Sequence, residues 1–243
     1  MFDALVISDL HLGSDNCQAR PLVHFLEAIH KKDVLTRRLI LNGDVFDSID
    51  FRRLKKQHWK ILSLFRKLSD DLEIIWINGN HDGPSDIISH LLGVSVSDEI
   101  AIRSGGRKIL FLHGHRFDAF IERYPVTTKL ADLLYRFLQR VDKTHTVARS
   151  AKHNSKMFLR SVQKVQDQAI EYARKHGCDA VCCGHTHLPA AVTGGDVEYY
   201  NSGCWTERPC HYLTVQDGVV ELCDYRDVAE EPVEEPTPAL VLA

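Results

Sequence analysis

Five short apolar runs recur along the chain, and polar residues follow each of them at once. The runs are apolar on both faces and rich in β-branched residues, a pattern typical of strands that are buried on both sides. They cover residues 4–8, 39–42, 74–78, 109–112 and 180–183. We therefore predict five buried strands with polar residues at their carboxyl ends.

Helical patterns alternate with these strands in the first half of the chain. Apolar residues recur at helical spacing over residues 22–29 and about 52–68, and a shorter helix is expected near 85–92. A further strand at 95–102 leads through a glycine turn into the fourth apolar run. This β-α-β-α-β order predicts an α/β fold with parallel strands and helices outside them.

The second half begins with a long stretch, residues 118–176, that shows no strand pattern. It is too long for a simple crossover, so we interpret about 118–159 as a helical insertion. Strand patterns then return, with Asp217-Gly218 as a hairpin turn, at residues 180–183, 197–201, 212–215 and 219–224. We predict one domain over residues 1–228 and a flexible, acidic and proline-rich tail over 229–243.

Composition limits the classes of function. The formal net charge of the 243 residues is -3, and four of the 33 acidic residues lie in the tail, so the rest of the chain is close to neutral. A broad nucleic-acid surface would require a clearly basic face, and nucleic acid is therefore not expected as a partner. No apolar run approaches the roughly 20 residues of a membrane-spanning helix.

Cysteine usage and the start of the chain both favour the cytoplasm. The seven cysteines are odd in number and form no C-x-x-C pair, which indicates free thiols in a reducing compartment. Cys182 and Cys183 are interpreted as small strand residues. The first strand pattern begins almost at the first residue, which leaves no room for a signal peptide. We therefore expect a cytoplasmic location.

The polar blocks after the five strands supply carboxylate, amide and imidazole groups. Residues placed just past strand ends fall in the crevice where layered α/β proteins gather their ligands. The blocks are Asp9-x-His11, Gly43-Asp44-x-x-Asp47, Gly79-Asn80-His81-Asp82, His113 and Gly184-His185-x-His187. Any one block is weak evidence, but five in the same position indicate a site for two divalent metal ions.

The chemistry of these groups suggests how two ions would be shared. Asp44 is the natural bridging carboxylate, because each of its oxygens can face one ion. Hard divalent ions prefer oxygen ligands, and imidazole extends the choice to manganese, iron and zinc. One ion would take Asp9, His11 and His187, and the other Asn80, His113 and His185. Two ions about 3.5–4 Å apart can clamp a phosphate during an in-line displacement.

Two further residues have roles other than ligation. His81 can donate a hydrogen bond to a phosphate and a proton to a departing oxygen. The Asp47 carboxylate can hold the His81 ring in a productive orientation. His115 lies outside the repeated pattern, and a structural role is favoured for it.

The motifs identify the chain as similar to the calcineurin-like metallophosphoesterases. All five blocks correspond to the motifs of that superfamily, from the first strand to beyond the middle of the chain. The resemblance implies a four-layer α/β sandwich, in which two mixed β-sheets are flanked by helices and the dinuclear site lies at their edge. It also implies the metal roles given above, with Mn²⁺ the first choice and iron, zinc and magnesium open.

Within that superfamily, the chain more closely resembles one family, the UDP-2,3-diacylglucosamine pyrophosphatases of bacterial lipid A synthesis. The similarity rests on the helical insertion after His113 and on three short motifs, which are Ser8-Asp9-Leu10-His11-Leu12-Gly13, Lys175-His176 and Gly203-Cys204-Trp205-Thr206-Glu207. The resemblance implies cleavage of a UDP-linked diacyl sugar to UMP and a lipid phosphate, under a lid formed by the insertion. His81 departs from the pattern, since the best-known members have arginine there.

The insertion supplies candidate substrate contacts. The family uses asparagine, serine and lysine of the equivalent segment, which implies Asn154, Ser155 and Lys156 here. The alternative is a solvated helix face, which charged residues at this spacing usually form. A lipid-linked substrate also implies peripheral contact with the inner membrane through the insertion.

Several functions remain open from the sequence. The same metal chemistry serves cyclic-nucleotide or generic phosphodiesterases, nucleases and protein phosphatases. The near-neutral body disfavours a nuclease, and the insertion disfavours an open-faced protein phosphatase. A scaffold that has lost activity ranks last, because every expected ligand is present. The sequence does not indicate an oligomeric state.

Overall fold

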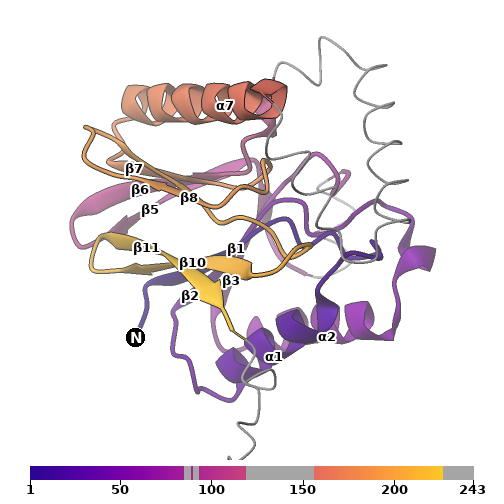
Figure 1. Ribbon diagram of the computed structural model, residues 1–243. Helices are drawn as coiled ribbons and strands as arrows, with labels where there is room; N and C mark the ends of the chain where they lie inside the picture. The colour runs from indigo at the N-terminus through magenta and orange to yellow at the C-terminus, as the bar shows by residue number, and fades with distance from the viewer. Residues whose placement is uncertain (85–88, 90–92, 119–155, 227–243) are drawn as a thin grey trace, which may run out of the picture.

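The computed structural model describes residues 1–84, 89, 93–118 and 156–226. Its strands form two mixed sheets that pack face to face between helices (Figure 1). The six-stranded sheet has the order β11-β10-β1-β2-β3-β4 and the five-stranded sheet the order β5-β6-β7-β9-β8. The prediction of a four-layer α/β sandwich is confirmed.

The six-stranded sheet is built around three parallel strands from the first half of the chain. They are β1 (Ala4–Ile7), β2 (Arg38–Asn42) and β3 (Glu73–Ile77). The short β4 (Val96–Ser97) extends this sheet on one side, and the hairpin of β10 (Cys210–Gln216) and β11 (Val219–Tyr225) extends it on the other. Asp217 and Gly218 form the hairpin turn with φ of 50° and 82°, as predicted.

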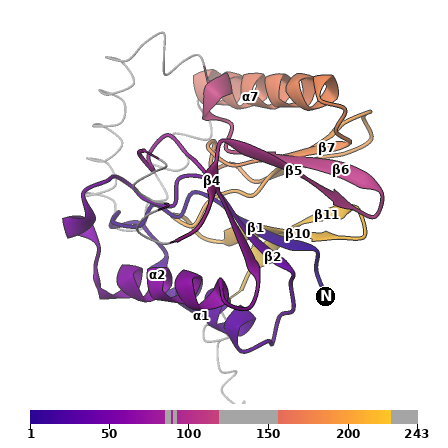
Figure 2. The same ribbon diagram turned by 180° about the vertical axis from the view of Figure 1, so that it is seen from behind.

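The five-stranded sheet combines strands from the middle and the end of the chain. The parallel strands β6 (Arg107–Leu112), β7 (Ala180–Cys183) and β9 (Glu198–Asn201) form its centre. The antiparallel strands β5 (Glu99–Ser104) and β8 (Ala190–Val192) lie at its edges. Figure 2 shows the chain passing from β4 in one sheet to β5 in the other.

Helices cover the outer face of each sheet. Helices α1 (Ala19–His30) and α2 (Lys56–Leu68) pack on the six-stranded sheet, where Trp76 and Phe65 are among the buried side chains. Helix α7 (Lys156–Lys175) packs on the five-stranded sheet through Ala169 and Ala173 (Figure 1). No helix in the described part of the chain is long and apolar enough to cross a membrane.

A third apolar layer lies between the sheets. It joins Val6, Ile40 and Ile77 of one sheet to Phe111 and Cys182 of the other. The even and odd residues of each strand therefore both face apolar layers, which explains why the five runs are apolar throughout.

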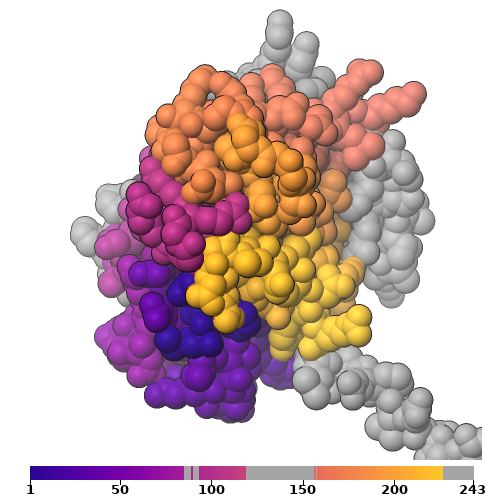
Figure 3. Space-filling view, turned by 90° about the vertical axis from the view of Figure 1, so that its left-hand side faces the viewer, coloured from indigo at the N-terminus to yellow at the C-terminus, as the bar shows by residue number. Residues whose placement is uncertain are grey.

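The turn between β5 and β6 meets the turn between β10 and β11 at one end of the molecule. The Ser104 hydroxyl donates to the Asp3 carboxylate at 2.6 Å, and the Gly218 main-chain N–H donates to the Ser104 hydroxyl at 2.8 Å. Figure 3 shows this end, where the β5–β6 turn lies against the β10–β11 turn. These bonds fix the relative position of the two sheets at the end opposite the carboxyl ends of the parallel strands.

The structure differs from the expected elements in three places. The helix expected from residue 52 begins as a short 3-10 helix, η1 (Phe51–Arg53), and is broken at the extended Leu54 before α2. The strand expected at 95–102 divides into β4 and β5, which belong to different sheets. Strand β8 is not indicated by the sequence, because it has three residues and two are exposed.

Some expected elements lie outside the described residues. They are the helix near 85–92, apart from Ser89, and the tail 229–243. The insertion expected over about 118–159 overlaps the described residues only at Asp118 and at the start of α7. The domain boundaries therefore remain predictions.

Phe111→Ala tests the layer between the sheets. Phe111 is fully buried there, so truncating it leaves a cavity and should lower the free energy of unfolding by about 3–5 kcal/mol. Urea denaturation monitored by circular dichroism measures the change. Val219→Ala is the control, since Val219 is 55% exposed and its truncation should have little effect. A loss below about 1 kcal/mol for Phe111→Ala would contradict this packing.

Candidate metal centre

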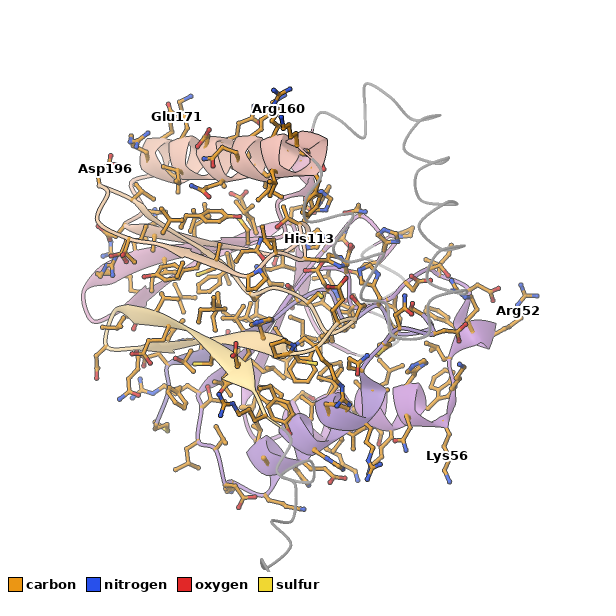
Figure 4. All side chains as sticks on the ribbon, in the orientation of Figure 1. Arg52, Lys56, His113, Arg160, Glu171 and Asp196 are labelled. Carbon is orange, nitrogen blue, oxygen red and sulfur yellow. The ribbon has the colours of Figure 1, made fainter. Side chains whose placement is uncertain are left out.

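The five polar blocks meet where the strands of both sheets end. Asp9 follows β1 and Asp44 follows β2, so both carboxylates come from the six-stranded sheet. His113 follows β6 and His185 follows β7, so these imidazoles come from the five-stranded sheet. Figure 4 shows His113 between the two sheets, on the side where these strands end. The cluster is therefore shared by the two halves of the sandwich.

The backbone at the cluster is held in a left-handed conformation. Seven described non-glycine residues have positive φ, and five of them are Asp9, His11, Asp44, His185 and His187, with φ between 47° and 68°. This conformation costs roughly 1–2 kcal/mol per residue and gathers at functional sites. It turns each side chain into the space between the strand ends.

Two glycines make the close packing of these loops possible. A Cβ atom at Gly43 would collide with the His113 ring, and one at Gly184 would lie 2.5 Å from an Asp9 carboxylate oxygen. Gly43 also has a φ of 89°. The glycines that precede Asp44 and His185 in the motifs are thus required by contact with ligands from the opposite sheet.

Asp9, His11 and His187 form one group of candidate ligands. The Nε2 atom of His187 lies 3.2 Å from an Asp9 carboxylate oxygen and 3.2 Å from Nε2 of His11. The Nε2 atom of His11 is 4.0 Å from the same Asp9 oxygen. Two ring nitrogens and a carboxylate oxygen converge here, which suits a cation.

Asp44, His113 and His185 form a second group. Nδ1 of His113 donates to the main-chain carbonyl of Asn42 at 2.9 Å, because a carbonyl can only accept. Nε2 of His113 is buried, lies 3.2 Å from the Asp44 carboxylate, and has no partner in hydrogen-bonding geometry. The same Asp44 oxygen is 3.8 Å from Nε2 of His11. Asp44 thus lies beside both groups, where a bridging ligand would be needed.

Main-chain donors hold the two buried carboxylates. The N–H of His185 donates to both Asp9 carboxylate oxygens, at 3.0 and 3.2 Å, and the N–H of His81 donates to Asp44 at 2.9 Å. Burial raises the pKa of Asp9, but His187 and His113 outweigh it and bring the pKa down to about 2. The pKa of Asp44 also lies well below its usual range, since His113 and His11 outweigh its burial. Both side chains are therefore carboxylates at neutral pH.

His81 and Asp47 lie at the exposed side of the cluster. The His81 ring is exposed and its centroid is 5.1 Å from that of His11. Its Nδ1 is 3.1 Å from the main-chain carbonyl of Asp47. The Asp47 carboxylate instead lies 3.6 Å from Nδ1 of His11 and 2.5 Å from the Arg53 guanidinium. The main-chain carbonyl of Asp47 is thus the group that contacts the His81 ring, and the expected orientation of His81 by the Asp47 carboxylate remains a prediction.

The pKa of Asp47 reflects these contacts. Burial raises it, but the nearby His11 ring and the charge of Arg53 outweigh burial and lower the pKa to about 2. Asp47, His11 and His81 also lie close enough to form a third group of candidate ligands.

Asn80 is exposed in the loop that carries His81. Its expected role as a ligand remains a prediction. Asn154 and Ser155 lie outside the described residues, and Lys156 is exposed at the first residue of α7. Their roles in binding substrate also remain predictions.

His115 is not part of the ligand groups among the described residues. Its ring centroid is 5.6 Å from that of His113. Burial and the nearby His113 and His185 lower the pKa of His115 to about 4, which keeps its ring neutral. The expectation of a structural role for His115 stays a prediction.

Several residues that support the cluster were not identified from the sequence. Asp82 is buried and accepts the N–H groups of Phe46 and Gly79, both at 2.9 Å, so it joins the loop of Asp44 to the loop of Asn80. Asn201, at the end of β9, donates to the Gly184 carbonyl at 2.7 Å. Asp82 stands within the third motif, and Asn201 ends the strand predicted over 197–201, so the signal available for both was their position in the sequence.

The donor set fits two divalent cations. Two buried carboxylates face imidazole nitrogens. The buried Nε2 of His113 has no hydrogen-bond partner, and a bound cation would give it one. The mixture of carboxylate oxygen and imidazole nitrogen is compatible with manganese, iron and zinc.

A two-sheet sandwich with this cluster at its strand ends is the arrangement of a metal-dependent phosphoesterase. A calcineurin-like phosphoesterase family model matches residues 2–189. The chain therefore belongs to the calcineurin-like phosphoesterase family, as the motifs indicated, and it is a phosphoester-hydrolysing enzyme.

Two relatives are both called UDP-2,3-diacylglucosamine hydrolase. The protein from Aeromonas salmonicida is 29% identical over 208 residues, which are 76% of this chain and 78% of the relative. The protein from Edwardsiella ictaluri is 29% identical over 208 residues, 76% of each chain. A solved archaeal phosphodiesterase superposes with a TM-score of 0.50 at 17% identity, over 91% of this chain and 98% of that one. The last similarity shows the fold alone.

Asp44→Asn tests the bridging position. The amide keeps an oxygen for the His81 N–H but removes the charge that faces both ligand groups. We expect hydrolysis to fall to background and the content of both ions to fall. Asp9→Asn should mainly reduce one ion. Elemental analysis after dialysis measures both, and two retained equivalents of metal in Asp44→Asn would refute a bridging role.

Metal binding should release a proton from His113. Burial lowers the pKa of His113, but Asp44 and Asp9 outweigh it and raise the pKa to about 10, so the metal-free ring is protonated at neutral pH. A cation must displace this proton, so affinity should rise by up to about tenfold per pH unit between about pH 6.5 and 8.5. Calorimetry in buffers of different ionisation enthalpy counts the protons, and binding without proton release would contradict the assignment.

The same shift predicts the pH dependence of the metal-free protein. Because the folded-state pKa of His113 is raised from 6.5 to about 10, its contribution to stability is complete below pH 6.5 and is lost as pH rises towards 10. Thermal melting in chelator should therefore show a smaller decline above pH 6.5 for His113→Asn than for the unmodified protein.

Proposed function

We propose that this enzyme hydrolyses the phosphoanhydride of UDP-2,3-diacylglucosamine, or of a closely related nucleotide-diphospho-lipid, with two Mn²⁺ ions. The observation that carries the chemistry is the position of Asp44, whose carboxylate lies 3.2 Å from His113 and 3.8 Å from His11 and so adjoins both ligand groups. The substrate is supported by the names of the two relatives, which match about three quarters of each chain.

The ligand residues would hold the ions in two sets that share Asp44. Asp9, His11 and His187 would hold one, and Asn80, His113 and His185 the other. When bound, two divalent ions supply Lewis acidity at phosphorus and lower the pKa of water. The buried carboxylates keep their charge at neutral pH because their pKa values are low, so no proton has to leave them before a cation binds.

His81 would act on the phosphate from the exposed side. Its Nδ1–H donates to the Asp47 carbonyl, so Nε2 is the nitrogen left for the substrate. The ring can donate a hydrogen bond to a phosphate oxygen or a proton to the departing oxygen. The main-chain N–H of the same residue holds Asp44, which ties the position of the acid to that of the shared ligand.

The location of the enzyme follows from the substrate. A diacylated nucleotide sugar would be reached at the inner membrane surface, so we propose a bacterial enzyme of the cytoplasm with peripheral membrane contact. The expected contact surface is the insertion, residues of about 118–159, with Lys156 at its described edge. Substrates without a lipid would not require this contact.

A second candidate is a phosphodiesterase for another substrate class. It is favoured by His81, which follows the general superfamily motif rather than the arginine of the best-known lipid A enzymes. An inactive scaffold ranks below both, because two groups of three candidate ligands lie close enough together to hold a cation.

A comparison of substrates tests the proposal. The Mn²⁺-loaded enzyme is assayed with UDP-2,3-diacylglucosamine, UDP-N-acetylglucosamine, a cyclic nucleotide and bis-nitrophenyl phosphate. We expect the highest kcat/KM for the diacylated substrate, with UMP and the lipid phosphate as products. A higher kcat/KM for the cyclic nucleotide or the simple diester would overturn the substrate assignment in favour of the second candidate.

His81→Ala separates acid catalysis from metal binding. The variant should retain both ions yet lose about 10²–10⁴-fold in kcat on the natural substrate, because it lacks the proton donor. A nitrophenyl ester has a good leaving group and should lose much less. His24→Ala on α1 is the matched control and should change neither rate. Equal losses on both substrates would contradict the acid role and leave phosphate binding alone.

A further inference from the structure

Asp118 places a third carboxylate beside the metal centre. It follows η2 (His115–Phe117) directly, and its side chain is 14% exposed. One carboxylate oxygen lies 3.1 Å from Nε2 of His185, and the other accepts the Ser161 hydroxyl at 3.0 Å. Asp118 therefore connects a candidate ligand to helix α7. It belongs to none of the five sequence motifs.

This contact fixes which nitrogen of His185 carries the proton. A carboxylate oxygen accepts hydrogen bonds, so in this contact Nε2 of His185 is the donor and Nδ1 is the nitrogen available for a ligand. The main-chain N–H of His185 is bound to the Asp9 carboxylate at the same time. Both ends of the residue are thus held, and its ring has one nitrogen left for a ligand.

His113 shows the complementary arrangement. Its Nδ1–H donates to the Asn42 carbonyl, which leaves Nε2 for a ligand. The two histidines of this group would therefore bind one ion through opposite ring nitrogens, each selected by an acceptor on the other nitrogen. Such outer partners orient metal-bound imidazoles and raise their basicity.

We propose that Asp118 is the positioning residue for His185, and that Ser161 on α7 holds Asp118 in place for this task. The proposal rests on the proposed two-metal function of the centre, but not on the identity of the substrate. Asp118 acts through the His185 ring: it sets the tautomer, fixes the ring plane and makes Nδ1 the ligand atom. The chain thereby links the second metal position to the helix that covers the five-stranded sheet.

Metal titration of four variants tests the proposal, with metal-free protein and calorimetric binding of Mn²⁺. Asp118→Ala should weaken one of the two ions about 10–100-fold and leave the other unchanged. Asp118→Asn retains a side-chain carbonyl oxygen that can accept the His185 N–H, just as the main-chain carbonyl of Asn42 accepts that of His113. This variant should therefore keep most of the metal affinity that Asp118→Ala loses. Ser161→Ala should fall between Asp118→Asn and the unmodified protein.

Asp196→Ala is the matched control. Asp196 also bonds to α7, through Arg174 at 2.6 Å, but it is exposed and lies far from His113 in Figure 4. The Asp196→Ala variant should bind both ions with the affinity of the unmodified protein. Thermal melting of all variants in chelator separates loss of metal affinity from loss of α7 packing.

A spectroscopic measurement reports the tautomer directly. Two-bond ¹H–¹⁵N correlation spectra of the Zn²⁺-loaded protein should show His185 protonated on Nε2, and should show a changed pattern in Asp118→Ala. Unchanged affinity for both ions in Asp118→Ala, or protonation of His185 on Nδ1, would overturn the proposal. Equal losses in Asp118→Ala and Asp118→Asn would instead show that the negative charge, not the orientation, matters. Since no readout uses the lipid substrate, failure of the substrate assignment would leave these results intact.

Discussion

The charge of two buried carboxylates governs this structure. Asp9 is 0% exposed and Asp44 is 2% exposed, and an unpaired charge buried to that degree would be strongly destabilising. Main-chain N–H groups and imidazoles surround both of them, and the low pKa values show that this environment favours the ionised forms. In the absence of metal His113 supplies the compensating charge as a protonated ring. A pair of divalent cations held by these residues would supply it more completely, so the electrostatic requirement that shapes the loops also favours cations as ligands.

The fold supports a backbone that would not be stable in isolation. Five of the ligand residues have positive φ, which together costs several kcal/mol on the basis of roughly 1–2 per residue. Rigid neighbours hold these loops in place. Buried strands end directly before them, Asp82 and Asn201 bind their main chain, and the apolar layer between the sheets fixes the strands. Stability in the core thus compensates for strain at the centre, in the manner typical of functional sites.

Sequence patterns predicted the strands and the ligand types well, because both depend on local features. The five apolar runs became β1, β2, β3, β6 and β7, since burial on both faces leaves a direct trace in composition. Individual side-chain contacts left no such trace. The turn of the Asp47 carboxylate towards Arg53 depends on the path of the loop after β2. The contact of Asp118 with His185 joins residues 67 positions apart in sequence, because β6 and β7 lie side by side in one sheet. Strand β8 escaped prediction because an exposed three-residue edge strand has no periodicity to detect.

The division of the ligands between the two sheets has a consequence for assembly. Asp9 and Asp44 come from one sheet, and His113 and His185 from the other, so neither half of the sandwich contains a complete coordination shell. A partly folded chain with one sheet formed would hold cations weakly, and tight capture becomes a late event that follows the docking of the sheets. Bound ions would join the halves at the carboxyl ends of the parallel strands, opposite the hydrogen bonds of Ser104 and Gly218 that join them at the other end. Ions held by these residues would therefore also serve as a non-covalent cross-link, and sliding of one sheet past the other would require their release.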